Sequence, residues 1–582
     1  MVIEAGRAAA IGLVACVALC AEGQVSPNGK IEVTADGDSG LSVICHNSGK
    51  GVKVMEIECG KATPDSKSTK KYKVSYNMLT GKRSHCTNQY REQAYTLSSG
   101  QKLLMRAYDD GIAWHSDAPD RVDLSEASHR YLMRWNEAYE GFFPEDEKET
   151  EGDRWGYPAL FRYTDGTWLL LSESNLDADC AAASMHSTAR TGEYDLIPDG
   201  PGEKGWQTAI IGTLDDVVAS TLVTDNSAPC RLDDTSWIEP GTASWVYWAY
   251  NHGSNDYEII RKYVDMAVEL GLPYVLIDAE WDEMKDGKSV EDAVSYAVQR
   301  GIKPIIWYNS SVGWINGAPG PKFRLNKPED REREFAWCEK IGVKGVKIDF
   351  FSGDTNLNIR YMTELLECAA KHHLLVNFHG ATVPRGWQRT YPNLISTEGV
   401  YGAEWYNNVP TFTDRAASHN AMLPFTRNVI GSMDYTPCAF SDSQHPHITT
   451  RGHELALTIL YESGIQHLAD RPESFLSQPD EVRQFLGSFP TAWDDTMLLN
   501  GEPGRYAVLA RRKGEKWYIA GINGTDEPME LHLSTGKLPK KARTGKKKFF
   551  TDNEDSSDWV IREIKGMPST ITLAPRGGFV IK

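Results

Sequence analysis

Residues 331–351 read REREFAWCEKIGVKGVKIDFF, and this stretch decides the fold class. Its first half has the apolar spacing of an amphipathic helix, predicted over Arg331–Ile341, and its second half is a short apolar strand, predicted over Gly345–Phe351. Lys347 and Asp349 are two residues apart on this strand, so their side chains point to the same side. The strand and helix pattern repeats from residue 241 to residue 493, which is typical of a parallel sheet built from βα units.

This central region has the size of a (β/α)8 TIM barrel, because eight βα units fit a domain of about 250 residues. Helices are predicted between the strands, for example over Asp256–Leu270, Val290–Arg300 and Leu357–His372. The eight predicted strands are Ser244–Tyr250, Tyr274–Trp281, Lys303–Asn309, Gly345–Phe351, Leu374–Gly380, Leu394–Gly399, Arg427–Met433 and Gln466–Asp470.

Both flanks of the barrel have the pattern of all-β domains. Residues 22–240 contain short alternating segments, such as Lys102–Tyr108 and Thr167–Leu171, interrupted by Gly, Asp, Asn and Pro. Residues 494–582 return to short strands, predicted over Tyr506–Arg511, Lys516–Ile522, Met529–Leu533 and Gly577–Ile581. We therefore expect a multidomain chain, α/β plus all-β, with a large N-terminal β-sandwich, a central barrel and a small C-terminal β-sandwich.

Composition excludes several classes of protein. A chain of 582 residues is longer than one hydrophobic core normally supports, and its 41% hydrophobic content is that of a globular protein. Two or three globular domains are therefore expected. The formal net charge is −18, and no stripe of Lys and Arg interleaved with aromatic residues is present, which excludes nucleic acid as a partner. The basic cluster Lys540–Lys548 is interpreted as a solvated loop.

The N-terminus indicates export. Arg7 precedes an apolar run, Ala8–Leu19, that fits a secretory signal over residues 1–21 better than a membrane span. A secreted, periplasmic protein follows, and a lipid anchor on Cys16, in a lipobox-like Leu-Val-Ala-Cys segment, is the alternative. The eight cysteines beyond Cys20 have no C-x-x-C spacing, so free thiols are expected at Cys338 and Cys368, while one or two disulfides among the N-terminal cysteines stay open.

Polar side chains gather at the ends of the predicted barrel strands, where TIM barrels place their active sites. Any one of them has an ordinary structural explanation, such as an ion pair or a helix cap, but their joint appearance indicates a site. Two carboxylates on different strand ends supply what glycosidic cleavage requires, an acid for the leaving oxygen and a second group for the anomeric carbon. The residues are Trp248, Asp278, Trp307, Asn309, Lys347, Asp349, Asn377, His379, Glu398 and Glu404.

Four segments together resemble glycoside hydrolase family 97, and the resemblance extends over nearly the whole chain after the signal. They are Lys347–Phe351, Asn377–Gly380, Arg385–Asn393 and Ser396–Trp405. The family implies an N-terminal β-supersandwich, a barrel, a C-terminal β-sandwich and a calcium ion in the active site. Carboxylate oxygens are ligands that Ca²⁺ prefers.

The resemblance also implies roles for residues. Asp349 takes the place of the nucleophile of retaining members, and Glu404 that of the acid/base. Glu398 and Glu173, the latter in the segment Ser172–Leu176, take the places of calcium ligands. Where inverting members carry a glutamate base after the histidine, this chain has Gly380. Sugar-binding roles are expected for Lys347, Asp278, His379, Asn309, Trp307 and Trp248.

The preferred interpretation is a retaining, exo-acting α-galactosidase that acts on an oligosaccharide or glycoside through a covalent intermediate. A retaining β-L-arabinopyranosidase is the second, because its sugar differs from galactose mainly by lacking the exocyclic CH2OH. An inverting α-glucosidase is third, since Gly380 supplies no base. A carbohydrate-binding protein without catalytic activity is the alternative from another class. The oligomeric state stays open.

Overall fold

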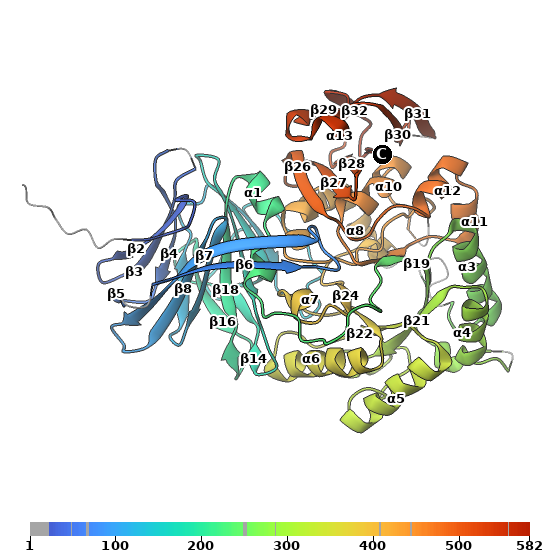
Figure 1. Ribbon diagram of the computed structural model, residues 1–582, viewed down its shortest axis with the longest axis horizontal. Coiled ribbons are helices and arrows are strands. Elements are labelled where there is room, and N and C mark those ends of the chain that lie inside the picture. The colour runs from blue at the N-terminus through green and yellow to red at the C-terminus, as the bar shows by residue number, and fades with distance from the viewer. Residues whose placement is uncertain are drawn as a thin grey trace, which may run out of the picture.

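The computed structural model describes residues 23–582 except Ser48, 66–68, 248–252, Asp286, 407–408, 443–444 and Ser557. Three regions follow one another along the chain, and Figure 1 shows them as a blue to teal β-region, a green to orange barrel and a red C-terminal cap. The predicted signal segment with Cys16, and the predicted sugar contact Trp248, lie outside the described residues.

The N-terminal region is one 16-stranded, folded antiparallel sheet plus a two-stranded sheet of β14 and β17. Two short helices, α1 (Leu214–Ala219) and α2 (Leu222–Asp225), follow it. The strands are β1 (Gln24–Val25), β2 (Ile31–Asp36), β3 (Gly40–Cys45), β4 (Val52–Glu58), β5 (Ala62–Pro64), β6 (Lys70–Asn77), β7 (His85–Leu97), β8 (Lys102–Tyr108), β9 (Gly111–Ser116), β10 (Asp120–Asp123), β11 (His129–Arg134), β12 (Arg154–Arg162), β13 (Trp168–Ser174), β14 (Cys180–Ala181), β15 (Ala183–Ser187), β16 (Glu193–Pro198), β17 (Glu203–Lys204) and β18 (Trp206–Gly212).

Alternation of side chains builds the core of this region. On β8, Leu103 and Met105 are fully buried, whereas Lys102 is exposed. Such a period of two places every second side chain on the inner face of a sandwich. The predicted N-terminal β-sandwich is therefore confirmed.

The barrel is a parallel sheet of seven strands in the order β24-β23-β22-β21-β20-β19-β25. Its strands are β19 (Gly241–Val246), β20 (Tyr274–Ile277), β21 (Lys303–Asn309), β22 (Gly345–Asp349), β23 (Leu375–Phe378), β24 (Leu394–Thr397) and β25 (Ile465–Leu468). Its helices are α3 (Tyr257–Leu270), α4 (Val290–Gln299), α5 (Pro328–Ile341), α6 (Asn356–Lys371), α7 (Trp387–Thr390), α8 (Pro410–Thr413), α9 (Ala416–Met422), α10 (Arg451–Leu460), α11 (Pro472–Leu476) and α12 (Asp480–Leu486), with 3-10 turns η1 (Trp281–Glu283), η2 (Ala403–Tyr406), η3 (Leu423–Phe425) and η4 (Arg427–Val429).

Helix boundaries follow local chemistry. Asp256 caps α3, since its carboxylate accepts hydrogen bonds from the amides of Glu258 and Ile259, and the helix ends at Gly271 in the left-handed conformation. The predicted helices over Asp256–Leu270 and Leu357–His372 agree with α3 and α6 to within one or two residues.

The predicted seventh strand, Arg427–Met433, is wrong. Residues 427–429 form the 3-10 turn η4, and the place between β24 and β25 is taken by an irregular segment whose Asp434 amide bonds the Thr397 carbonyl. The buried Arg427 guanidinium donates to carbonyls of Thr397, Glu398, Gly399, Gly431 and Ser432. A side chain thus satisfies polar backbone groups that a regular strand would have paired.

The C-terminal region contains a six-stranded antiparallel sheet and a two-stranded sheet, with its own apolar core between them. The expected C-terminal β-sandwich is confirmed. Its elements are β26 (Asp495–Glu502), β27 (Tyr506–Lys513), β28 (Lys516–Asn523), β29 (Met529–His532), η5 (Thr535–Lys537), α13 (Lys540–Arg543), β30 (Lys546–Asp552), β31 (Trp559–Lys565), β32 (Thr570–Leu573) and β33 (Gly578–Ile581).

The β6–β7 hairpin reaches from the N-terminal sheet to the side of the barrel that faces it (Figure 1). Its tip contacts both other regions, because the Gly81 amide donates to Glu462 of the barrel and the Lys82 carbonyl accepts from Thr496 of the C-terminal region. The three regions are therefore packed as one unit.

All eight cysteines in the described part of the chain are free thiols, including the buried Cys338 and Cys368. The disulfides that stayed open for the N-terminal cysteines are therefore not formed. Among the same residues, no helix combines the length and apolar character needed to cross a bilayer.

Candidate active site

The predicted polar residues converge at the C-terminal ends of the barrel strands. Trp307 of β21 is in register with Lys347 of β22, which in turn is in register with Asn377 of β23. Asp349 is the last residue of β22, and Glu398 directly follows β24. Neighbouring parallel strands end at the same edge, so residues far apart in sequence share one site.

A cavity of about 520 Å³ opens at this edge. This volume lies in the range of small-molecule sites, and the wall combines carboxylates, a lysine and aromatic rings, as a sugar site requires. Its lining residues are Glu137, Ala138, Glu140, Tyr247, Asp278, Ala279, Trp307, Trp314, Pro319, Lys347, Asp349, Phe350, Phe351, Gly380, Glu398, Glu404 and Trp405.

Asp349 is held in a single orientation. Its Oδ2 accepts a hydrogen bond from the Trp307 indole at 3.1 Å, and its Oδ1 accepts from the Phe350 amide at 2.8 Å. Burial raises the pKa of the Asp349 carboxyl, and the ammonium group of Lys347, 3.9 Å from Oδ2, opposes that shift. Lys347 itself is anchored by Asp278, whose Oδ2 lies 3.1 Å from Nζ.

Gly380 leaves the space that Asp349 occupies. Its φ is +48°, and a Cβ built there would lie 2.9 Å from Asp349 Oδ1 and 2.9 Å from the Phe350 amide nitrogen. Such approaches are shorter than normal contacts, so any side chain at position 380 would displace the Asp349 carboxyl. A side chain at position 380 would therefore require Asp349 Oδ1 and the Phe350 backbone to shift.

Glu404 lies in the η2 turn after β24 and lines the same cavity. Burial raises the pKa of its carboxyl to about 8, with the Lys347 charge opposing and the Glu398 charge adding to the shift. A carboxyl with this pKa holds its proton at neutral pH, which is the state that a general acid needs.

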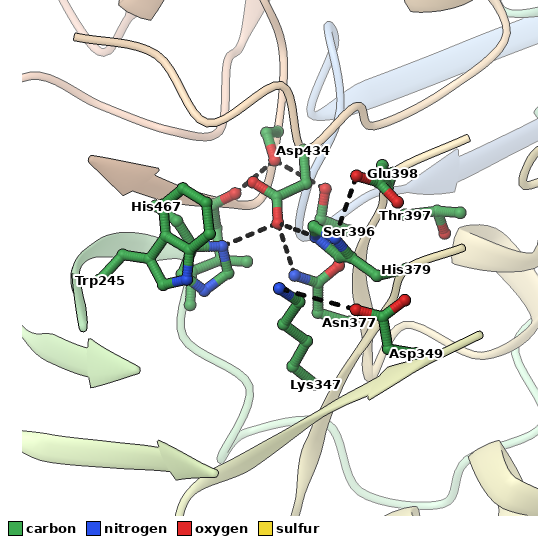
Figure 2. A network of polar contacts seen from close by, with 12 residues as sticks. Trp245, Lys347, Asp349, Asn377, His379, Ser396, Thr397, Glu398, Asp434 and His467 are labelled. Atoms are coloured by element: carbon green, nitrogen blue, oxygen red, sulfur yellow. Dashed lines mark hydrogen bonds and ion pairs between the residues drawn. The ribbon is translucent and has the colours of Figure 1, made fainter. Parts of the chain in front are cut away.

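A buried polar network supports the cavity from below, and Figure 2 shows the Asp434 carboxylate at its centre. Asp434 Oδ2 lies 2.6 Å from Asn377 Nδ2, 2.7 Å from His379 Nε2 and 2.7 Å from His467 Nδ1. Burial would raise the pKa of Asp434, but the two histidines outweigh it and hold this pKa far below its usual value. The second nitrogen of His379 lies 3.2 Å from Glu398 Oε1, and the Gly380 amide donates to Glu398 Oε2 at 2.7 Å, so these two contacts orient Glu398.

Glu173 is not part of this site, which corrects its expected role as a metal ligand. Its Oε2 accepts from Arg385 Nε at 2.9 Å and from the Ala183 amide at 3.0 Å, while Oε1 accepts from Gln207 at 3.2 Å. Both oxygens are therefore occupied by protein donors. The Glu173–Arg385 ion pair joins the N-terminal sheet to the loop after β23, so Glu173 fixes the contact between the two regions.

Glu137 and Glu140 are carboxylates that the N-terminal region does bring to the cavity. Burial raises the pKa of Glu140 well above the usual value, and the charges of Glu398 and Glu404 add to the shift. Tyr139, its neighbour, anchors the segment to the barrel, because its hydroxyl donates to Asp354 at 2.6 Å.

The donor set fits a hard divalent cation. Ligand atoms of His379, Glu398 and Glu404 lie within 4.8 Å of one another, and Glu140 lines the same space. Several buried carboxylates without enough nearby cations favour a bound metal ion, and carboxylate oxygens suit calcium. Glu398 belongs to this cluster, and Glu140 lines the cavity beside it.

Two expected sugar contacts serve other purposes. The Asn309 amide donates to the carbonyls of Trp314 and Pro319, each at 3.3 Å, so it holds the loop after β21. His379 has both ring nitrogens directed at carboxylates and does not line the cavity. Asp278, Trp307 and Lys347 do line it, and their sugar-binding roles stay predictions.

Several site residues were not singled out from the sequence. Glu140 and Trp314 lie in loops, where no periodic pattern marks them, and Asp434 lies in the irregular segment that replaces a strand. Trp405 lies in η2 at the end of the segment Ser396–Trp405, but no role was assigned to it. His467 had a detectable signal, because it falls in the predicted strand Gln466–Asp470 and points to the same end as the other site residues.

A parallel barrel with paired carboxylates, an anchored lysine and aromatic walls at its C-terminal edge defines a glycoside hydrolase. Comparison with known families supports this. Residues 25–229 match the family described as Glycosyl-hydrolase 97 N-terminal, residues 237–400 match Glycoside hydrolase 97, and residues 492–582 match Glycosyl-hydrolase 97 C-terminal, oligomerisation. The chain belongs to glycoside hydrolase family 97, and its substrates are carbohydrates.

Two curated relatives carry related names. A probable retaining alpha-galactosidase of Streptomyces bingchenggensis is 38% identical over 468 residues, covering 75% of this chain and 70% of the relative. A retaining alpha-galactosidase of Bacteroides thetaiotaomicron is 32% identical over 356 residues, covering 57% of this chain and 51% of the relative. The chain thus spans about half the length of the second relative.

Solved structures share the whole fold. A crystal structure of a beta-arabinopyranosidase superposes with a TM-score of 0.85 at 25% identity, over 96% of this chain and 99% of that chain. A family 97 enzyme from Pseudoalteromonas sp. strain K8, in complex with panose, gives a TM-score of 0.80 at 21% identity with the same coverage.

Proposed function

We propose that the protein is a retaining, exo-acting α-galactosidase. One observation carries the proposal: Asp349 occupies the end of β22 facing the cavity, and the residue that follows His379 is Gly380, which carries no carboxylate. A direct nucleophile is thereby present and a water-activating base on β23 is absent. The names of the two curated relatives support galactose as the sugar.

The chemistry follows in two steps. Asp349 attacks the anomeric carbon and forms a covalent glycosyl–enzyme, while Glu404 gives its proton to the leaving oxygen. Glu404, now ionised, then removes a proton from water, which attacks the same carbon and breaks the bond to Asp349. Two inversions at the anomeric carbon give net retention.

Neighbouring residues keep these groups in their working states. The Lys347 ammonium and the Trp307 indole favour the ionised, correctly turned form of Asp349. Asp278 and Lys347 also line the cavity floor, where the carboxylate can accept from sugar hydroxyls and the ammonium group can donate to them. Glu140 and Glu398 would hold calcium, which when bound supplies positive charge to polarise a sugar hydroxyl.

The test measures stereochemistry and sugar preference. Proton NMR of the first-formed sugar from an aryl α-galactoside should show the α-anomer, with the β-anomer appearing only by mutarotation. Aryl α-glucoside and β-L-arabinopyranoside serve as comparison substrates. Early release of the β-anomer would remove Asp349 from the role of nucleophile.

A retaining β-L-arabinopyranosidase is the second candidate. The structural similarity to a beta-arabinopyranosidase over 96% of this chain favours it. The two activities share the mechanism above and differ in whether the cavity accepts an exocyclic CH2OH. A kcat/KM for the arabinopyranoside above that for the α-galactoside would select it. An inverting α-glucosidase finds no base at position 380.

The cellular site proposed from the N-terminal sequence is the periplasm. A signal over residues 1–21 supports export, and acylation of Cys16 would instead leave the enzyme anchored. Mass spectrometry of the mature N-terminus distinguishes the two.

A further inference from the structure

Trp314 lines the mouth of the cavity, in the loop between β21 and α5. Its side chain is 50% exposed, whereas the lining residues Lys347 and Asp278 are each 2% exposed. The buried residues Lys347 and Asp278 therefore form the floor of the cavity, and the half-exposed Trp314 lies at its mouth. In an enzyme that removes a terminal sugar, the cleaved sugar fills the floor and the leaving group extends toward solvent, where Trp314 lies.

The loop that carries Trp314 is tied to the residues at the nucleophile. The Ser310 amide donates to the Asp349 carbonyl at 2.8 Å, and the Gly313 amide donates to the Phe350 carbonyl at 2.9 Å. A Cβ at Gly313 would lie only 2.4 Å from that Phe350 carbonyl, so glycine is needed for this approach. The position of Trp314 is therefore set by the backbone next to the reacting centre.

The indole ring is also fixed in orientation. It packs edge to face against Phe350, with ring centroids 4.9 Å apart at 76°, and its Nε1 donates to the Asn316 carbonyl at 2.7 Å. Phe350 in turn packs edge to face against Trp307, with centroids 5.7 Å apart. A rigid, half-exposed indole offers apolar surface at low entropic cost, a property of aromatic binding residues.

We propose that Trp314 forms the leaving-group subsite and takes the apolar C–H face of a pyranose ring attached to the cleaved sugar. This proposal rests on the proposed function. It implies that the substrate is an oligosaccharide in which a second pyranose follows the terminal galactose. Its binding energy serves the step in which the leaving group departs. Hydrolysis of the glycosyl–enzyme, from which that ring has gone, does not use it.

The experiment compares two donors that form the same glycosyl–enzyme. Galactosyl-α-1,6-glucose has a pyranose leaving group, and α-galactosyl fluoride has none. Trp314→Ala should lower kcat/KM for the disaccharide roughly three- to tenfold, as expected for the loss of one aromatic contact, and leave the fluoride nearly unchanged. Trp314→Phe should recover most of the loss.

Phe323→Ala is the matched control, because Phe323 lies in the same loop, is 59% exposed and does not line the cavity. The Phe323→Ala substitution should leave kcat/KM unchanged for both donors. Equal losses with both donors in Trp314→Ala would overturn the subsite and make Trp314 a residue that positions Asp349; no loss with either would overturn it as well. If the wild type fails to hydrolyse α-galactosyl fluoride, the proposed function is wrong. The subsite is then tested in the same way with β-L-arabinopyranosyl fluoride and a disaccharide in which β-L-arabinopyranose is linked to a second pyranose.

Discussion

Replacing Gly380 by alanine should slow formation of the glycosyl–enzyme while the protein stays folded. The added Cβ would lie 2.9 Å from Asp349 Oδ1, where ordinary contact begins at 3.4 Å, and the Phe350 amide blocks relaxation on the other side. The nucleophile must therefore move by about 0.5 Å. Because a 1 Å misplacement can cost on the order of 100-fold in rate, we expect a loss on the order of tenfold in kcat/KM.

The same substitution also carries a backbone cost. Gly380 has φ +48°, and a residue with a Cβ in this left-handed region costs about 1–2 kcal/mol. Gly514→Ala is the matched control, since Gly514 has φ +57° in the C-terminal region and a Cβ added there would have no atom within 4 Å. Both variants should lose stability through the left-handed backbone, Gly380→Ala at least as much as Gly514→Ala because its Cβ also meets Asp349 and Phe350, but only Gly380→Ala should lose activity.

The assay is kcat/KM for α-galactosyl fluoride beside urea denaturation of the wild type and both variants. Fluoride needs no protonation to depart, so this donor reports on Asp349 rather than on Glu404. Full activity in Gly380→Ala, with a loss of stability at least equal to that of Gly514→Ala, would refute the idea that residue 380 controls the position of the nucleophile.

Three further predictions concern the carboxylates, the metal and the buried histidines. Azide should rescue Glu404→Ala with a glycosyl azide of retained configuration and Asp349→Ala with the inverted one, and the reverse pattern would exchange the two roles. Exhaustive chelation should lower activity, and calcium should restore it better than magnesium; unchanged rates with no metal found by elemental analysis would contradict a metal site. Burial lowers the pKa of His419 to about 4 and that of His453 to about 3, whereas a histidine in the unfolded chain has a pKa of about 6.5. Below pH 6.5 the unfolded state therefore binds more protons than the folded state. The free energy of unfolding should fall by roughly 2 kcal/mol per histidine between pH 7 and pH 5. In urea denaturation, the His453→Gln variant should show a smaller decrease in the free energy of unfolding between pH 7 and pH 5. An unchanged decrease would show that His453 is not a source of the pH dependence.

Some elements could be predicted because their information is local. The strand that ends at Asp349 is a short apolar run, and helix α6 carries Ile359, Met362 and Leu366 at helical spacing on its buried face. Arg427–Met433 has comparable apolar character, yet its conformation is decided by the buried Arg427 guanidinium, which bonds carbonyls about 30 positions away as well as its neighbours. No local pattern contains that information.

The sequence by itself determined the class of fold, the edge of the barrel that carries the site, and the two carboxylates Asp349 and Glu404 as the reacting pair proposed above. Periodicity and strand ends carry the fold class and the edge within a few residues, whereas the roles of Asp349 and Glu404 come from the resemblance to glycoside hydrolase family 97. Only the tertiary structure decided that Glu140 rather than Glu173 reaches the cavity, and that Asp434 collects His379 and His467 beneath it. The physical reason is that the partner of a buried charge is chosen by packing between distant segments, where each unpaired carboxylate is costly, and sequence spacing does not record which segments meet.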